Sequence, residues 1–145
     1  LVGSEMCIRD SFSGLARVAD LRGLSVVDAS ALDSIESCDW LLLCTGQSEK
    51  WGSEEYFGTE PLFTEAFVKT AARIARKGIG LDCSGLDREG VALHCVWFSS
   101  GGGLMVENLT DLEILLSESQ ILFAAYPLKL AAGDGAPVRA VAVLG

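Results

Sequence analysis

Apolar residues in this chain fall into several short runs and one amphipathic stretch. The run "DWLLLC", from Asp39 to Cys44, is continuously apolar after its first residue, which predicts a strand buried on both faces. The runs "LMVENL", "ILFAAYPL" and "PVRAVAVL" predict further strands, and Asp134-Gly135 predicts a tight turn between the last two. Apolar strands must be covered by another layer of the domain, and an amphipathic helix can provide it.

The amphipathic stretch predicts a helix over residues 65–77. Thr64 is a good N-cap, Glu65 lies in the first turn, and apolar residues recur with helical spacing up to Gly78. The segment "IGLD", from Ile79 to Asp82, then predicts a strand that follows the helix. Alternation of strands and helices indicates the α/β class, with a mixed sheet and packed helices.

Two segments allow more than one interpretation. The apolar segment "ALHCVWFSS", residues 92–100, suits a strand or a helix, and we expect a short buried helix that ends at Gly101–Gly103. The long loop "TGQSEKWGSEEYFGTE" carries Trp51, Tyr56 and Phe57. These aromatic residues fit a substrate wall or interface as well as they fit packing of the loop onto the domain.

Composition narrows the function classes. The 145 residues suit one soluble domain, and no apolar run is long enough to cross a bilayer. The net charge of −9 argues against binding to nucleic acid or to an anionic membrane. Cys38, Cys44, Cys83 and Cys95 lie in apolar stretches without CxxC spacing. We therefore expect reduced thiols and a cytoplasmic location.

Few residues offer chemistry. His94 is the single histidine of the chain, and Glu107 follows a predicted strand thirteen positions later. Taken alone, each is more often a packed or solvated residue than a metal ligand, and two ligands do not complete a metal site. Asp82, Ser84 and Asp87 suit either the polar lining of a cleft or a turn capped by its own side chains. No glycine-rich segment follows a phosphate-binding pattern.

Taken together, three segments resemble the cyclase family of metal-dependent hydrolases, which includes bacterial kynurenine formamidase and isatin hydrolase. They contain "GIGLDCSGLD", "LHCVWFSSGGGLMVENL" and "LFAAYPLKLAAGDGAPVRAVAVL", and the likeness runs from about Ser11 to the C-terminus. The resemblance implies the swivelling β/β/α fold of that family. It also implies metal-assisted hydrolysis of a small amide or formamide such as N-formylkynurenine, as in an arylformamidase that serves tryptophan catabolism.

By the same resemblance, His94 and Glu107 are the metal ligands, the metal is zinc or manganese, and the protein is a homo-oligomer. The resemblance assigns no catalytic residue to this chain and leaves the substrate-binding residues unknown. Gln47 stands where the family commonly has an aromatic residue after "TG", which puts the shape of the substrate pocket in question.

The family's HxGTHxDxPxH motif, which supplies most other metal ligands, has no counterpart here. Residues 1–10, "LVGSEMCIRD", resemble a translated sequencing adapter. We therefore expect residues 1–10 to be a non-native leader and residues 11–145 to be one domain without its N-terminal part, inactive as written. The alternative is a genuine short protein that keeps the fold as a non-catalytic binding or oligomerisation module.

Overall fold

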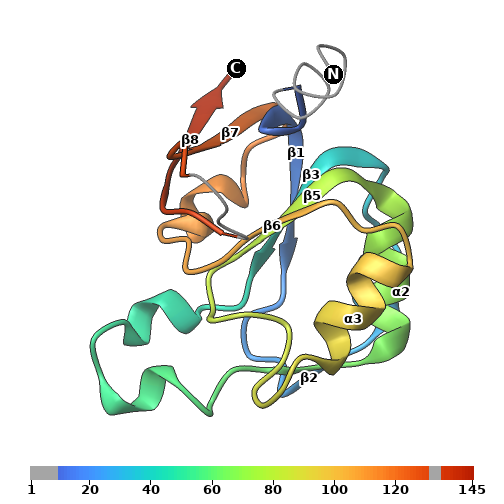
Figure 1. Ribbon diagram of the computed structural model, residues 1–145, viewed down its shortest axis with the longest axis vertical. Coiled ribbons are helices and arrows are strands. Elements are labelled where there is room, and N and C mark those ends of the chain that lie inside the picture. Colours follow the sequence, from blue (N-terminus) through green and yellow to red (C-terminus); the bar gives the residue numbers. More distant parts are fainter. Residues whose placement is uncertain (1–9, 131–134) are drawn as a thin grey trace.

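The computed structural model describes residues 10–130 and 135–145 and contains one curled six-stranded sheet (Figure 1). The strand order is β6-β5-β3-β1-β7-β8. The first four of these strands are parallel, whereas β7 pairs antiparallel with β1 and with β8. The strands are β1 (Ser13–Asp20), β3 (Cys38–Cys44), β5 (Ala75–Leu81), β6 (Leu104–Val106), β7 (Ile121–Pro127) and β8 (Val138–Leu144).

Shorter elements connect these strands. The pair β2 (Val26–Val27) and β4 (Leu62–Phe63) forms a separate two-stranded parallel sheet. The helices are α2 (Glu65–Ile74) and α3 (Ala92–Ser99), and the 3-10 turns are η1 (Ala29–Leu32), η2 (Gln47–Lys50), η3 (Glu54–Tyr56) and η4 (Leu112–Leu115). The mixed α/β architecture confirms the class expected from the sequence.

Strand β3 lies in the middle of the sheet and is buried on both faces, as its apolar run predicted. Leu41 and Leu43 face the helices with Ile79 and Leu81 of β5. Trp40 and Leu42 point to the opposite face, where β7 and η4 cover them. Burial on both faces explains why this strand has no polar alternation.

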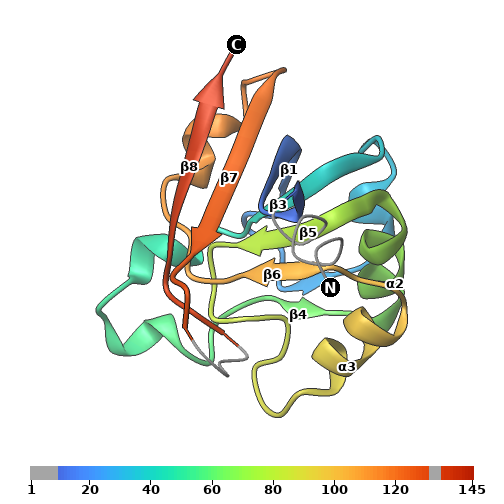
Figure 2. The same ribbon diagram turned by 45° about the horizontal axis from the view of Figure 1, so that its top comes forward.

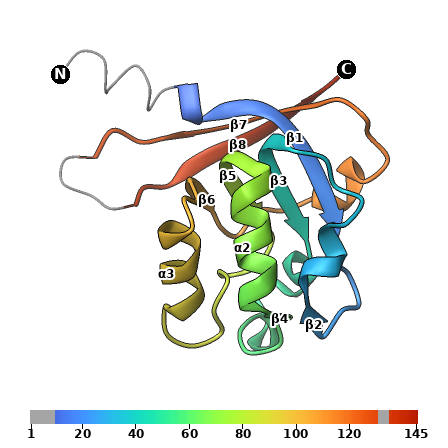
Figure 3. The same ribbon diagram turned by 90° about the vertical axis from the view of Figure 1, so that its right-hand side faces the viewer.

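Helices α2 and α3 lie side by side on one face of the sheet (Figure 3). The predicted N-cap is confirmed, because the Thr64 hydroxyl accepts a hydrogen bond from the Phe67 amide. Phe67, Val68 and Ala71 form the buried side of α2. Helix α2 therefore anchors β5, which follows it directly and leads towards Asp82.

The predicted end of this helix at Lys77 was wrong, since α2 ends at Ile74 and β5 begins at Ala75. Ala75 pairs with Cys38 of β3, and the Ser37 hydroxyl donates to the Ile74 carbonyl. Sheet pairing and this side-chain cap outweigh the helical propensity of "ARK". The strand expected at Ile79 consequently starts four residues earlier.

Residues 92–99 of this segment form helix α3, as expected, but the helix is not buried. Only Trp97 is fully enclosed, while Cys95 and Phe98 are exposed. Cys95 therefore does not behave as a core residue, in contrast to the other three cysteines named above. Gly101 ends the helix with a φ of 85°, a conformation that favours glycine.

The hairpin of β7 and β8 tilts away from the parallel strands (Figure 2). The three C-terminal strand predictions are confirmed by β6, β7 and β8. The turn expected at Asp134-Gly135 falls partly on residues 131–134, outside the described residues, as does most of the expected leader. No helix in the described ranges has the length and apolarity needed to span a bilayer.

Candidate metal centre

His94 lies in the first turn of α3 and is oriented by an aspartate that precedes the helix. The Asp87 carboxylate oxygen Oδ2 lies 2.7 Å from the His94 ring nitrogen Nδ1. The same carboxylate accepts hydrogen bonds from the backbone amides of Leu93 and His94. Asp87 thus caps the helix and also fixes the direction of the imidazole.

Glu107 approaches the other side of this ring from the end of β6. Its Oε1 lies 3.2 Å from His94 Nε2. Gly85 allows this approach, because a Cβ atom there would lie 2.8 Å from Glu107 Oε1. The structure therefore brings together both of the ligands that the resemblance implied, from two separate elements.

The charges around His94 favour its protonated form in the absence of a cation. Burial alone would lower the pKa of His94, but the hydrogen bonds that its ring donates to the Asp87 and Glu107 carboxylates outweigh burial and raise the pKa above its usual value. Burial likewise tends to raise the pKa of Asp87, but the amide of Leu93 and the ring of His94 lower it overall. The carboxylates of Asp87 and Glu107 thus lie on opposite sides of the His94 imidazole, each beside one ring nitrogen.

This arrangement fits two positions of a metal site. With Asp87 on Nδ1, His94 Nε2 faces Glu107 and would present its lone pair to a cation in the neutral ring, the orientation seen for histidine ligands backed by a carboxylate. Adjacent ligands of a zinc or manganese ion with bonds of about 2.0–2.2 Å lie roughly 3.0–3.5 Å apart, which matches the separation of Nε2 and Oε1. Within the described ranges, no group of three or more His, Cys, Asp or Glu side chains is arranged to hold a metal.

The other polar candidates have structural contacts. Asp82 is fully buried and accepts hydrogen bonds from the Thr45 amide, the Thr45 hydroxyl and the Gly46 amide. It therefore ties the end of β5 to the end of β3. The Ser84 hydroxyl donates to Oε1 of Glu60, a buried side chain whose Oε2 has no hydrogen-bonding partner among the residues that the structure describes.

The long loop after β3 divides into a packed part and an exposed part. Gln47, where the family commonly has an aromatic residue, is buried, and its amide donates to the carbonyl of Tyr56 and to the Thr59 hydroxyl. Tyr56 is also buried, whereas Trp51 and Phe57 are exposed and stack edge-on against it. Figure 1 shows this loop extending beyond the sheet.

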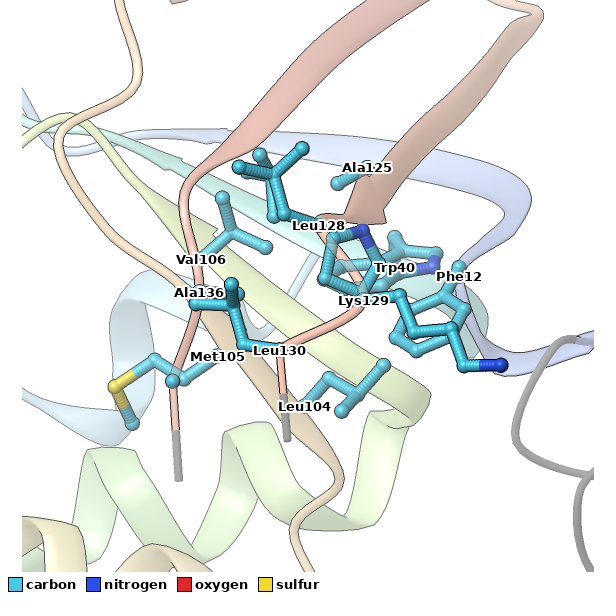
Figure 4. Close-up of a pocket in the computed structure, with 13 residues that line it drawn as sticks. Phe12, Trp40, Leu104, Met105, Val106, Ala125, Leu128, Lys129, Leu130 and Ala136 are labelled. Atoms are coloured by element: carbon cyan, nitrogen blue, oxygen red, sulfur yellow. The ribbon is translucent and has the colours of Figure 1, made fainter. Parts of the chain in front are cut away.

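One apolar cavity is separate from His94, which is not among its lining residues. It has a volume of about 560 Å³ and lies between β6, the end of β7 and the start of β8 (Figure 4). Its lining is mainly apolar and includes Trp40, Leu104 and Leu128. A more polar cavity of about 420 Å³ adjoins Glu107 and is also lined by Asn108, Thr110 and Asp111.

The chain was compared with known proteins in sequence and in structure. No protein-family model matches the chain. An uncharacterised protein of Methanocaldococcus jannaschii is 32% identical over 113 residues, which cover 77% of this chain and 58% of that protein. The solved structure of a potential metal-dependent hydrolase with cyclase activity is 25% identical, with a TM-score of 0.71 over 91% of this chain and 65% of the other.

A third relative supports the fold alone. Isatin hydrolase A from Ralstonia solanacearum superposes with a TM-score of 0.77 at 20% identity, over 94% of this chain and 62% of that one. The chain has the fold of the cyclase-family hydrolases. It spans 58% of the length of the curated relative and 62–65% of the solved cyclase-fold structures described here.

Within the cyclase-family fold, Asp87 and Tyr56 are the residues whose structural roles sequence reasoning missed. An aspartate a few residues before a helix is a signal for capping, so Asp87 could have been assigned that contact. No local pattern connects Tyr56 with Asn108, whose side chain accepts a hydrogen bond from the Tyr56 hydroxyl across 52 positions.

Proposed function

We propose that this chain belongs to the cyclase family and supplies two ligands, His94 and Glu107, to the metal centre of a metal-dependent hydrolase. The observation that carries the proposal is the convergence of His94 Nε2 and Glu107 Oε1, with Asp87 on the opposite nitrogen of the ring. Such a triad is typical of metal-binding histidines. The likeness to a potential metal-dependent hydrolase gives independent support.

A bound divalent cation would supply an activated water and polarise the carbonyl of the substrate. The chain's own residues prepare the ligands for that cation. Asp87 keeps the proton of the neutral imidazole on Nδ1 and so leaves Nε2 available, while the Glu107 carboxylate provides an anionic donor. Imidazole and carboxylate together suit zinc or manganese.

The proposed reaction is hydrolysis of a small amide, with a formamide such as N-formylkynurenine as the leading substrate, as in an arylformamidase. The support is the resemblance of the segments around His94 and Glu107 to that family. The polar cavity beside Glu107 offers space next to the ligands. The net charge of −9 opposes a nucleic-acid or anionic-membrane partner.

We also propose that the protein is a homo-oligomer and is cytoplasmic. Leu15, Leu122 and Val143 are cross-strand neighbours on β1, β7 and β8, and all three are exposed. Exposed apolar rows of this kind are commonly covered by another chain. The buried, reduced Cys38, Cys44 and Cys83 fit a reducing compartment.

The second candidate is a non-catalytic binding or oligomerisation module. In its favour, the described residues bring two candidate ligands together, whereas a catalytic zinc usually has three protein ligands. For the same reason we expect the chain as written to bind metal weakly and to be inactive.

Calorimetric titration with zinc and with manganese separates the two candidates. The proposal predicts weak binding that is lost in both His94→Ala and Glu107→Gln and kept in the control Glu113→Gln, which alters an exposed carboxylate on η4. Binding that survives both site substitutions, or no binding at any accessible metal concentration, would favour the module.

A further inference from the structure

The backbone at Asn108, the residue after Glu107, has an uncommon conformation. β6 ends at Val106, and Asn108 has a φ of 58°, in the left-handed region that few residues other than glycine adopt. The amides of Asn108 and Leu109 donate to the carbonyls of Cys83 and Leu81, so the bend is fastened to the end of β5. The direction of the Glu107 side chain depends on this bend.

Glu107 has little else to fix its side chain. Its carboxylate is about one-third exposed, and within the described ranges His94 is its single hydrogen-bonding partner. Among the described residues, this one contact to His94 is the hydrogen bond that holds the carboxylate in place, and it depends on the direction that the bend gives to the side chain. A group that stabilises the bend consequently acts on the position of Glu107.

Tyr56 provides such a group from the loop after β3. Its hydroxyl donates a 2.5 Å hydrogen bond to Oδ1 of Asn108. The ring is 2% exposed and lies between Trp51 and Phe57, with centroid distances of 4.9 and 5.0 Å. Burial raises the pKa of the Tyr56 hydroxyl to about 12, so it remains a donor at neutral pH.

Gln47 connects this loop to the sheet end. The side-chain amide of Gln47 donates to the backbone carbonyl of Tyr56, and the backbone amide of Gln47 donates to the Thr45 hydroxyl. The Tyr56 ring is thus held from its backbone as well as by its aromatic neighbours. A rigid donor of this kind can select one conformation of Asn108.

We propose that Tyr56 is a positioning residue for Glu107: through its hydrogen bond to Asn108, it holds the left-handed bend that presents the Glu107 carboxylate to His94 Nε2. The inference rests on the proposed function, in which that pair binds a divalent cation. It assigns to the loop after β3 a role in the metal centre, although no residue of the loop is a ligand.

The test compares zinc affinity in matched variants of the full chain. Tyr56→Phe removes the hydroxyl alone, and Tyr126→Phe makes the same change at an exposed tyrosine that bonds Ser13. We expect Tyr56→Phe to weaken zinc binding roughly threefold to tenfold, the effect of one hydrogen bond, and Tyr126→Phe to leave it unchanged. Equal affinities of Tyr56→Phe and the parent would overturn the inference.

A double-mutant cycle shows whether Tyr56 acts through Asn108. If it does, Tyr56→Phe combined with Asn108→Ala binds zinc no more weakly than Asn108→Ala alone. Fully additive losses would contradict the proposed route. Thermal melts of all variants show that each is folded under the titration conditions.

Nuclear Overhauser contacts between the His94 ring and the Glu107 side chain test the positioning without metal. The inference predicts their loss in Tyr56→Phe and their retention in Tyr126→Phe. Retention in both variants contradicts it. If the parent shows contacts that Tyr56→Phe lacks, yet no zinc binding that depends on His94, the proposed function fails while the positioning role stands.

Discussion

Asp87 Oδ2 lies 2.7 Å from His94 Nδ1 and also accepts the backbone amide of the same histidine. One carboxylate therefore fixes both the start of α3 and the orientation of its imidazole. Because the two contacts share an oxygen, the orientation of the ring is coupled to the start of the helix.

Replacing Asp87 with Asn keeps an oxygen for capping but removes the charge next to His94. We expect zinc affinity to fall about tenfold or more, as is usual when the partner of a ligating histidine is lost. The melting temperature should fall only slightly. Asp33→Asn is the matched control. Asp33 is exposed and precedes β3 in the sequence, whereas Asp87 and His94 follow that strand. Unchanged zinc affinity in Asp87→Asn would show that this carboxylate does not prepare the ring.

Metal binding should depend on pH through His94. The pKa of His94 is raised because the bonds to Asp87 and Glu107 favour its proton over the opposing effect of burial. A cation must displace that proton, so apparent zinc affinity should fall about tenfold per pH unit below the raised pKa.

Glu107→Gln removes one cause of that shift, so the His94 pKa should move downward in this variant. The titration of the His94 ring, followed by NMR without metal, measures this directly. The linked stability has a defined sign: the contribution of protonated His94 is complete below its unfolded pKa and is lost as pH rises through the folded value. A His94 pKa that does not respond to Glu107→Gln would contradict the observed contact.

Asp82 should matter for stability more than for binding. It is fully buried and holds the start of the loop after β3 through three donors from Thr45 and Gly46. Asp82→Ala leaves these donors without their acceptor, and we expect a loss of about 3 kcal/mol or more in the free energy of unfolding. Chemical denaturation measures the change, with Asp33→Ala as control. A loss comparable to that of the control would mean that water replaces the carboxylate.

The thiols should differ in reactivity. Burial raises the pKa of Cys83 to about 12 and that of Cys44 to about 11, and Cys38 is also buried, whereas Cys95 is exposed on α3. Under native conditions a thiol reagent should modify Cys95 rapidly and these three only on unfolding. Cys95→Ser should remove one fast-reacting thiol. Rapid modification of the Cys83 thiol in the native protein would indicate that the end of β5 opens.

Much of the fold could be predicted, because strong local patterns coincide with its core. The apolar run of β3 and the capped stripe of α2 are decided by burial alone. Strand β1 gave no clear signal, since Arg17 interrupts its apolar positions, and the end of α2 depends on pairing between Ala75 and Cys38, a contact across 37 positions. Long-range pairing of this kind is invisible to local propensity.

The candidate metal centre was less predictable. Spacing alone gave no reason to pair His94 with Glu107, and the family resemblance suggested both. The structure adds what the resemblance lacked, namely the contact of Asp87 with the far nitrogen and the bond from Tyr56 to Asn108. Both contacts depend on how loops fold back onto other elements, and no periodic pattern in the sequence predicts such contacts.

His94 and Glu107 are proposed to share one divalent cation. A crystal of the chain soaked in zinc, with anomalous data collected at the zinc absorption edge, tests it most directly. We expect an anomalous peak about 2.0–2.2 Å from both His94 Nε2 and the Glu107 carboxylate. A peak bound elsewhere, with this pair still in direct contact, would contradict it.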